Sequence, residues 1–383
     1  MGKQVATVVA LRRGRVLLVA QPRAAVLALP GGGVEAGESA RDAAARELAE
    51  ETGIDVAAGA LADLGLALEG AGRVTLRPFA LLDPPRPSTP AELATRWTAI
   101  DALAGVALAA GVARSVHAAL ALAATAQPVP EELLEWWHGR ADAFPWRVTR
   151  DPYAVLVCEV MSQQTQIERV RERWERWMER WPSAAALAAA TPGEVLRSWQ
   201  GLGYPRRARD LHACARRIAE EGWPERLTDL PGVGPYTADA IRCFAFEEPV
   251  LPRDANVRRV LARRFPGGIE GASWALASAL MDLGRTHCRV RPRCEGCPLA
   301  RGCLVALERS WDPVVRPHRQ ARYAGSLRAR RGALLRAALA GERPGPASDP
   351  EAARTLVADG LLELRDGVLV EPAAIVGGGR WSS

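Results

Sequence analysis

The sequence predicts a multidomain protein in which an α/β domain is followed by a nearly all-helical region and a small module of two helices and a hairpin. Three observations lead to this order. Short β-branched runs alternate with helical segments over residues 1–125, helical segments punctuated by Pro and Gly fill residues 131–310, and an Asp-Gly turn joins two short strands near the end of residues 325–372. A Pro-containing linker is expected at 126–130 and a flexible tail at 373–383.

Composition excludes several classes of protein. The chain has 383 residues, of which 48% are apolar and 25% are charged, and this balance is typical of a folded chain rather than a disordered one. No apolar run reaches membrane-spanning length, and the first residues lack the apolar stretch of a signal peptide. We therefore expect a cytoplasmic protein without disulfides and with no membrane partner, whose seven cysteines need another explanation.

The excess of positive charge is confined to the part of the chain after the α/β domain. Residues 1–125 carry 12 basic and 12 acidic side chains, whereas the remainder carries 38 and 32, and so the whole net charge of +6. Twelve arginines against three acids between residues 285 and 331 are typical of a protein that binds nucleic acid. An arginine bias of the genome is the alternative explanation of the charge alone.

The elements of the α/β domain follow from its β-branched runs and from its Gly and Ser positions. Ser39 is the expected N-cap of a helix that stops at Gly53. The predicted order is a hairpin of residues 5–10 and 16–20, a Gly-rich loop at 30–33, a helix at 39–52, strands near 74–82 and a helix near 112–124.

Three carboxylates share one face of the helix predicted at 39–52. Glu47, Glu50 and Glu51 follow the i, i+3, i+4 spacing of a helix face. Such acids repel one another unless a cation lies among them, and Mg²⁺ accepts these oxygen ligands together with substrate phosphates. Arg46 can bridge the acids. A solvated acidic helix face is the alternative for such a cluster taken alone.

The segment resembles the Nudix box, in which Gly, five residues, Glu and seven residues precede Arg-Glu-apolar-any-Glu-Glu-any-Gly-apolar. The matching positions are Gly32, Glu38, Arg46, Glu47, Leu48, Glu50, Glu51, Gly53 and Ile54. The resemblance implies an α/β Nudix sandwich that hydrolyses a nucleoside diphosphate linked to another moiety, with Mg²⁺ on Glu47, Glu50 and Glu51 and with Glu50 and Glu51 catalytic. The Leu29–Gly32 lead-in is most similar to the MutT branch, which cleaves nucleoside triphosphates.

A pair of glycines two residues apart lies within the helical region. Gly232 and Gly234 allow a tight turn whose backbone N–H groups can reach a phosphate. Glu159 lies upstream of this turn and Asp254 downstream, and either acid alone is typical of an ordinary surface or cap position.

Taken together, the motifs of residues 144–303 resemble MutY, the adenine DNA glycosylase of the helix-hairpin-helix superfamily. The matching segments are Pro145–Arg147, Asp151–Tyr153, Glu159–Met161, Gln163–Gln166, Gly201–Tyr204, the glycine turn, and Asp254 with Asn256. The resemblance implies excision of adenine mispaired with guanine or 8-oxoguanine in double-stranded DNA.

The resemblance assigns roles that suit cleavage of an N-glycosidic bond. Glu159 is the expected general acid, Asp254 stabilises the cationic sugar, and Asn256 helps to place it. Tyr236 stands in the catalytic site where lyase-competent relatives carry a lysine, and Lys3 is the only lysine of the chain, so no Schiff base is expected. The residues expected to contact DNA are Gln163, Gln164, Tyr204, Arg206, Gly232 and Gly234, of which Gln164 and Tyr204 match residues that wedge into the duplex.

Four clustered cysteines predict a metal site after the helical core. Their spacing alone fits either Zn²⁺ or an iron–sulfur cluster. Their position resembles the [4Fe–4S] loop of MutY and endonuclease III, although the first gap has five residues where the family has six. The four are Cys288, Cys294, Cys297 and Cys303, whereas Cys158, Cys214 and Cys243 lie in apolar helical contexts and are expected in the core.

The chain departs from the MutY pattern at two places and in its C-terminal part. Ser162 stands where leucine is usual, and Ala277-Ser278 stand where Asn with Gln or Glu is usual, both near the base pocket of the family. The family's C-terminal lesion-reading domain, which is Nudix-like and carries a Phe-Ser-His loop, has no recognisable counterpart after residue 305. An Arg-rich stretch at 319–331 and a winged-helix-like module are predicted there instead.

The sequence therefore predicts a monomeric, bifunctional enzyme of DNA maintenance. Its Nudix hydrolase would remove oxidised nucleoside triphosphates, and its monofunctional glycosylase would remove adenine opposite oxidised guanine. Two alternatives stay open: the Nudix domain is a non-catalytic reader of 8-oxoguanine in DNA, or the glycosylase acts on a different damaged base.

Overall fold

The structure is a computed structural model. It describes residues 3–21, 24–70, 74–124, 126–138, 144–165, 167–309, 311–314 and 322–373. Within these ranges, no helix is both long enough and apolar enough to cross a membrane. Three features predicted from the sequence lie partly outside them, namely Gln166, residues 319–321 of the Arg-rich stretch, and all but the first residue of the tail at 373–383.

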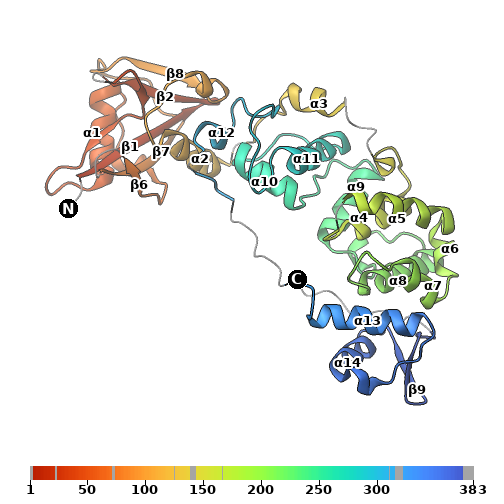
Figure 1. Ribbon diagram of the computed structural model, residues 1–383. Helices are drawn as coiled ribbons and strands as arrows, with labels where there is room; N and C mark the ends of the chain where they lie inside the picture. Colours follow the sequence, from red (N-terminus) through yellow and green to blue (C-terminus); the bar gives the residue numbers. More distant parts are fainter. Residues whose placement is uncertain are drawn as a thin grey trace. The chain divides into compact units, whose positions relative to one another are not determined.

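A mixed eight-stranded sheet forms the centre of the N-terminal α/β domain (Figure 1). Its central strand β1 pairs in parallel with β7 and antiparallel with β2, and the tight β1–β2 turn places Arg13 and Gly14 at positive φ. The domain consists of β1 (Lys3–Arg12), β2 (Arg15–Ala20), β3 (Leu27–Ala28), β4 (Gly31–Gly33), α1 (Ala40–Thr52), η1 (Ala58–Ala60), β5 (Ala62–Asp63), β6 (Leu68–Gly70), β7 (Val74–Leu82), β8 (Thr95–Ala99), η2 (Ile100–Gly105) and α2 (Val112–Ala123).

Each face of this sheet buries its own apolar core because successive side chains of a strand point to opposite sides. On β1, Val8 packs with α1 residues such as Leu48, whereas the next residue, Val9, packs with α2 residues such as Val116. The short helix α12 (Leu304–Leu307) adds Leu304 to the α2 side. The N-terminal domain is therefore a sandwich of helix, sheet and helix, as the sequence predicted.

The predicted start and stop of α1 are confirmed. The Ser39 side chain accepts a hydrogen bond from the Asp42 amide, and Gly53 ends the helix in the left-handed region at φ 72°. The expected helix over 39–52 thus begins one residue later, after its cap. These ends fix the face on which Glu47, Glu50 and Glu51 lie.

The region after residue 130 is helical, as predicted. Pro occupies the first turn of α4, α7 and α9, where its missing N–H is no loss. The elements are α3 (Glu131–His138), η4 (Pro145–Arg147), α4 (Pro152–Ser162), α5 (Ile167–Arg180), α6 (Ala184–Ala188), α7 (Pro192–Ser198), α8 (Arg206–Glu221), η5 (Leu227–Asp229), α9 (Pro235–Phe244), α10 (Ala255–Arg264), α11 (Trp274–Thr286) and α12.

The chain folds into two compact units, each built from separate segments. One unit contains residues 1–138, 255–271 and 279–316, and the other contains residues 139–254, 272–278 and 317–383. The Nudix-type sheet and the four-cysteine loop belong to the first unit. Glu159, the glycine turn and the C-terminal module belong to the second, and the predicted domain boundaries stay predictions.

The C-terminal module has the predicted order of two helices and a hairpin. It comprises α13 (Leu327–Leu339), η6 (Pro346–Ser348), α14 (Pro350–Ala358), β9 (Glu363–Arg365) and β10 (Val368–Val370), with Asp366 and Gly367 at positive φ in the turn. Buried Arg209 of α8 binds the Asp210 carboxylate and the Asp359 carbonyl, so α8 and this module are in direct contact within their unit. The likeness to a winged helix stays a prediction.

Candidate active sites

The acidic face of α1 meets the glycine strand β4 at close range. A Cβ added at Gly32 would overlap the Glu47 carboxylate, so only glycine lets this acid approach the backbone there. The amide of Gly31 donates a 2.8 Å hydrogen bond to Oε2 of Glu51. The glycines and the carboxylate helix are thus parts of one site. The loop predicted at 30–33 was wrong, however, because Gly31–Gly33 pair with β1 as the strand β4.

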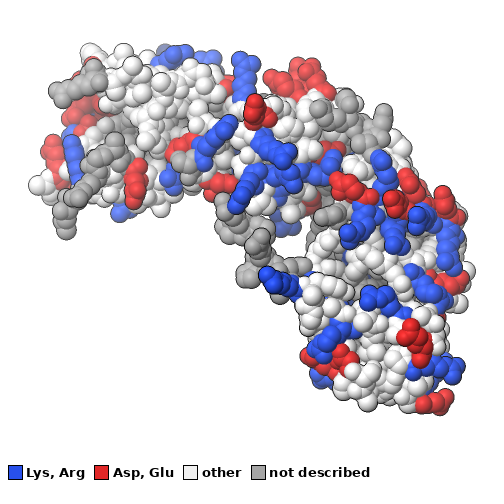
Figure 2. Space-filling model, viewed as in Figure 1, with Lys and Arg blue, Asp and Glu red and all other residues white. Residues whose placement is uncertain are grey.

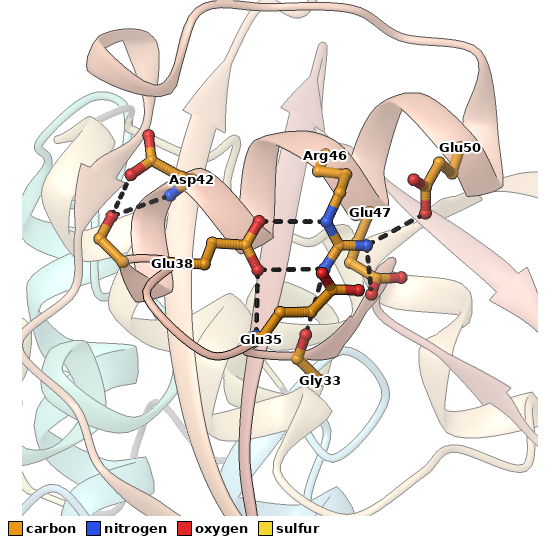
Figure 3. A network of polar contacts seen from close by, with 8 residues as sticks. Gly33, Glu35, Glu38, Asp42, Arg46, Glu47 and Glu50 are labelled. Carbon is orange, nitrogen blue, oxygen red and sulfur yellow. Dashed lines mark hydrogen bonds and ion pairs between the residues drawn. The ribbon is translucent and has the colours of Figure 1, made fainter.

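Arg46 holds the acids of this site together (Figure 3). Its guanidinium lies 3.0 Å from Glu38, 2.9 Å from Glu47 and 3.2 Å from Glu50, and it also donates to the carbonyl of Gly33. These pairs lower the pKa of Glu38 and raise that of Arg46. The bridging role predicted for Arg46 is confirmed, and it orients the carboxylates without neutralising all of them.

Glu51 is a half-buried member of the acidic cluster. Burial, together with the charges of Glu47, Glu92 and Glu50, raises its pKa to about 7, although the Gly31 hydrogen bond acts in the opposite direction. Carboxylates that destabilise one another in this way form a donor set suited to a hard divalent cation such as Mg²⁺. The residues present therefore fit the predicted metal.

Glu159 projects from α4 toward Tyr236 of α9, and both side chains are half-buried. The Tyr236 hydroxyl donates a 2.8 Å hydrogen bond to Oε2 of Glu159. Burial raises the pKa of Glu159 to about 7, the nearby charge of Asp254 acts in the same direction, and Tyr236 and Arg147 oppose both. The structure thus brings together three of the predicted site residues, Glu159, Tyr236 and Asp254.

A small cavity adjoins Glu159 and contains one of the departures from the MutY pattern. Trp146, Arg147, Glu159 and Ser278 are among its lining residues. Nη1 of Arg147 donates a 2.9 Å hydrogen bond to the Ser278 hydroxyl, and Ser278 is buried. The hydroxyl therefore lies beside the predicted acid, where it can influence which base fits. Ser162, the other departure, lies at the end of α4, with its hydroxyl 3.8 Å from Sγ of Cys158.

Two loops carry the residues predicted to wedge into DNA, and both are backbone-strained at those residues. Gln164 has φ 54° and Tyr204 has φ 47°, values that are uncommon for side chains other than glycine. Gln164 and Tyr204 are both exposed. Such strain persists only where surrounding contacts hold it.

Arg207 supplies those contacts from a buried position on α8. Its guanidinium donates to the carbonyls of Val160, Met161 and Gln163 at the end of α4 and to those of Leu202 and Gly203 in the other loop. Burial lowers its pKa to about 10. Carbonyls at a helix C-terminus carry partial negative charge, so the carbonyls at the end of α4 stabilise this cation.

The glycine turn before α9 has the geometry that its spacing predicted. Gly232 has φ 74°, and a Cβ there would lie 2.8 Å from Cβ of Asp210, so glycine is required for conformation and for space. Gly234 forms the N-cap of α9 without a side-chain cap, and Pro235 follows it. The first amides of α9 are thus available for a phosphate.

The remaining predicted residues are placed individually. Oδ1 of Asn256 accepts a 2.6 Å hydrogen bond from Arg259, and a Cβ at Gly284 would overlap Cβ of Asn256, which packs α10 tightly against α11. Asn256 belongs to the first unit, so its role beside Glu159 stays a prediction. The Gln163 carbonyl accepts from Arg207, and Arg206 lies 3.6 Å from Asp359.

All four predicted cysteine ligands line one small cavity in the first unit. Burial raises the pKa of Cys288, Cys297 and Cys303, and the mutual charge of these thiols contributes in the same direction. In the described part of the chain, no three His, Cys, Asp or Glu side chains group as ligands of a single metal ion. Four thiols around a common cavity are nevertheless the donor set of a cluster bound by thiolates.

Arg263 organises this cysteine loop and was not predicted from the sequence. Its buried guanidinium pairs with Asp312 at 2.6 Å, donates to Sγ of Cys288 at 3.4 Å, and binds the carbonyls of Arg289 and Val290. The sequence analysis did not single out Arg207 or Arg263, because arginine is abundant throughout the chain. Their position on the apolar face of a helix was the only available signal. Cys158, Cys214 and Cys243 are buried, as predicted.

Comparison with known proteins decides the family. A model for the HhH-GPD superfamily of base excision DNA repair proteins matches residues 157–268, and a NUDIX domain model matches residues 2–114. The adenine DNA glycosylase of Mycolicibacterium smegmatis is 39% identical over 273 residues, which cover 61% of this chain and 92% of that protein. The chain belongs to the adenine DNA glycosylase family.

This member of the adenine DNA glycosylase family carries a NUDIX domain in its N-terminal part, and both resemblances read from the sequence are confirmed. Solved structures similar to parts of the chain include a thermostable thymine-DNA glycosylase (28% identity, TM-score 0.41, 46% of this chain and 94% of that one). Another is a MutT NUDIX hydrolase from Burkholderia pseudomallei (24% identity, TM-score 0.26, 30% of this chain and 96% of that one).

Proposed function

We propose that the glycosylase part of this chain excises adenine paired with guanine or 8-oxoguanine in double-stranded DNA and leaves an abasic site with an intact backbone. The observation that carries this proposal is the half-buried carboxyl of Glu159, which accepts a hydrogen bond from Tyr236 and whose pKa of about 7 keeps much of it protonated at neutral pH. An acid that holds its proton is what the departing base requires.

The proposed chemistry uses Glu159 and Asp254, with Asn256 in the role that the resemblance implies. Glu159 donates a proton to a ring nitrogen of adenine, the C1′–N9 bond breaks, and its electron pair leaves with the base. Asp254 stabilises the cationic sugar, and Asn256 helps to place it. Water then adds to C1′ and releases a proton, which completes the abasic site. The adenine reaches this site only after it has left the base stack.

The DNA contacts proposed here come from the exposed loops of the same unit. Gln163 and Gln164 lie in one strained loop, Tyr204 and Arg206 lie in or next to the other, and the uncapped start of α9 after the Gly232–Gly234 turn is a candidate phosphate site. Basic side chains are frequent over the helical part on the face shown in Figure 2, whereas fewer lie over the sheet of the N-terminal domain. This distribution supports a DNA-binding surface on the helices.

Excision from defined duplexes tests this function. We expect removal of adenine opposite 8-oxoguanine and opposite guanine, and no removal of thymine opposite guanine or of alkylated bases. Glu159→Gln should lower excision by about 10²–10⁴-fold while binding of the lesion duplex survives. The hydrogen bond from Arg147 to buried Ser278 leaves a second candidate substrate, a different damaged base, and activity on an alkylated base alone would favour it.

We infer that the N-terminal domain is an active Nudix hydrolase that converts nucleoside triphosphates, including oxidised ones, to monophosphates. Support comes from the cluster of carboxylates on α1, where Glu47, Glu50 and Glu51 would hold Mg²⁺. The ion would polarise substrate phosphate oxygens. A domain that only reads lesions in DNA needs no such acids. Release of pyrophosphate from a nucleotide panel, with and without Mg²⁺, separates the two.

We infer that Cys288, Cys294, Cys297 and Cys303 hold a [4Fe–4S] cluster rather than zinc. Support comes from their common cavity and from Arg263, which donates to Cys288 and can offset the negative charge of a thiolate-bound cluster. Protein purified without oxygen should be brown and contain about four iron atoms per chain. A colourless protein with one tightly bound zinc would contradict the assignment.

A further inference from the structure

A cavity of about 660 Å³ lies between the Gly201–Tyr204 loop and α13. Both walls belong to the same compact unit, and α13 is the first helix of the C-terminal module. The volume is within the ~300–1,000 Å³ typical of cavities that bind small molecules. The module therefore forms one wall of a ligand-sized space beside the loop predicted to enter DNA.

The cavity is positively charged. Among the residues that the structure describes, five arginines line it and no acidic side chain does. Asp359 lies behind the wall, where it pairs with Arg331 and at 3.6 Å with Arg206, and so holds these arginines in place. The five are Arg169, Arg206, Arg328, Arg331 and Arg336. A ligand that carries phosphate or offers hydrogen-bond acceptors suits this lining.

Two exposed aromatic rings face the same cavity from opposite walls. Tyr204 is 38% exposed and Tyr323 is 57% exposed. A Cβ at Gly332 of α13 would lie 3.0 Å from the Tyr323 hydroxyl, so the absence of a side chain there lets Tyr323 lie close to the helix. Arg328 links the two walls through a 3.4 Å hydrogen bond to the Tyr204 hydroxyl. Exposed rings of this kind are platforms on which nucleobases stack.

We propose that this cavity takes the nucleotide of the opposite strand whose partner adenine has been turned out of the helix, and that α13 thereby reads the base opposite the excised adenine. The proposal rests on the proposed function, in which Gln164 and Tyr204 wedge into the duplex, and both residues line the cavity. The unpaired base stacks on Tyr204 and Tyr323. The arginines of α13 bind its phosphate and, where that base is guanine, its O6 and N7 acceptors, which arginine recognises in a bidentate manner. This assigns a role to the C-terminal module.

Binding to uncleavable product duplexes tests the proposal. One duplex carries a tetrahydrofuran abasic analogue opposite guanine, and the other carries it opposite a second abasic analogue. We expect the full-length protein to bind the first duplex about tenfold more tightly, since stacking and arginine contacts are absent from the second. Tyr323→Ala and Arg328→Ala should each remove most of this preference and leave affinity for the second duplex nearly unchanged.

Arg354→Ala is the matched control, because it removes the same charge from an exposed position on α14 outside the cavity. It should retain the full preference, and circular dichroism should show all variants folded. The proposal is overturned if Tyr323→Ala and Arg328→Ala both keep the wild-type preference, or if they weaken both duplexes equally. Wild-type protein that excises no adenine would instead contradict the proposed function.

Discussion

The hydroxyl of Tyr236 donates a 2.8 Å hydrogen bond to Oε2 of Glu159, and the two side chains come from α9 and α4. This hydrogen bond stabilises the ionised carboxylate, whereas burial and the charge of Asp254 stabilise the neutral acid. The resulting pKa of about 7 is a balance between these effects. Tyr236 thus adjusts how readily the proposed acid gives up its proton.

The first prediction concerns the pH dependence of excision. The reactive form of Glu159 is protonated, so the single-turnover rate should fall as pH rises through about 7. Tyr236→Phe removes a donor that favours the ionised form. The pKa of Glu159 should therefore rise, and the falling limb of the pH–rate profile should move to higher pH.

Rate profiles measured between about pH 5 and 9 on adenine opposite 8-oxoguanine check this. Tyr153→Phe serves as the control, because its buried hydroxyl contacts Trp177 rather than Glu159. If the limb of Tyr236→Phe coincides with that of the wild type, Glu159 is not the group that titrates.

The second prediction separates the two activities. Glu50→Gln and Glu51→Gln should each lower nucleotide hydrolysis by about 10²-fold or more, because each removes a charge from the proposed Mg²⁺ site. Neither should alter adenine excision. Glu69→Gln removes an equal charge from an exposed position on β6 and should retain both activities. Loss of excision in folded Glu51→Gln protein would show instead that the two domains are functionally coupled.

Local patterns explain why much of both sites could be predicted. The i, i+3, i+4 spacing of the acids, the Ser39 cap and the Gly53 stop fix one helix face without reference to the rest of the chain. The sequence also predicted that glycines lie close to that face, although as a loop rather than as the strand β4. In such cases the contacting residues are close together in the sequence, and few residue types can occupy their positions.

Long-range contacts explain what could not be predicted. Arg207 binds carbonyls 44 to 47 residues away at the end of α4. Every residue has a backbone carbonyl, so the sequence does not show which carbonyls accept these hydrogen bonds. The aromatic and arginine wall that α13 presents to Tyr204 is separated from it by more than a hundred residues, and only folding brings them together. Both features became visible only in three dimensions.

The third prediction tests Arg207. An ammonium has three donors on a flexible stem, so Arg207→Lys cannot serve the carbonyls of both loops and leaves buried acceptors unpaired. We expect a loss of about 1–3 kcal/mol in the free energy of unfolding. Excision from duplex DNA should fall at least tenfold, because Gln164 and Tyr204 lose their fixed positions.

The matched control is Arg216→Lys, an exposed position on the same helix that pairs only loosely, at 3.9 Å, with Glu220. It should change neither melting temperature nor rate. A 2-aminopurine probe beside the target adenine shows whether the rate falls because the base is turned out less often or because the acid has changed. With Arg207→Lys, its fluorescence rise on base turning should be smaller, while the pH limb of excision stays at the wild-type position.

The last prediction concerns strand cleavage. β-Elimination in this superfamily requires an amine that forms a Schiff base with the sugar, and Tyr236 offers a phenol at that place. Lys3 is the only lysine of the chain, and it lies on β1 of the other unit. Arginine stays protonated and cannot replace it. Excision should therefore leave DNA that breaks only after alkali or heat, and borohydride should trap no covalent adduct. Tyr236→Lys places an amine beside Glu159 and should gain a trappable adduct, whereas Tyr236→Phe should not. An adduct formed by the wild-type protein would mean that another nucleophile reaches the sugar.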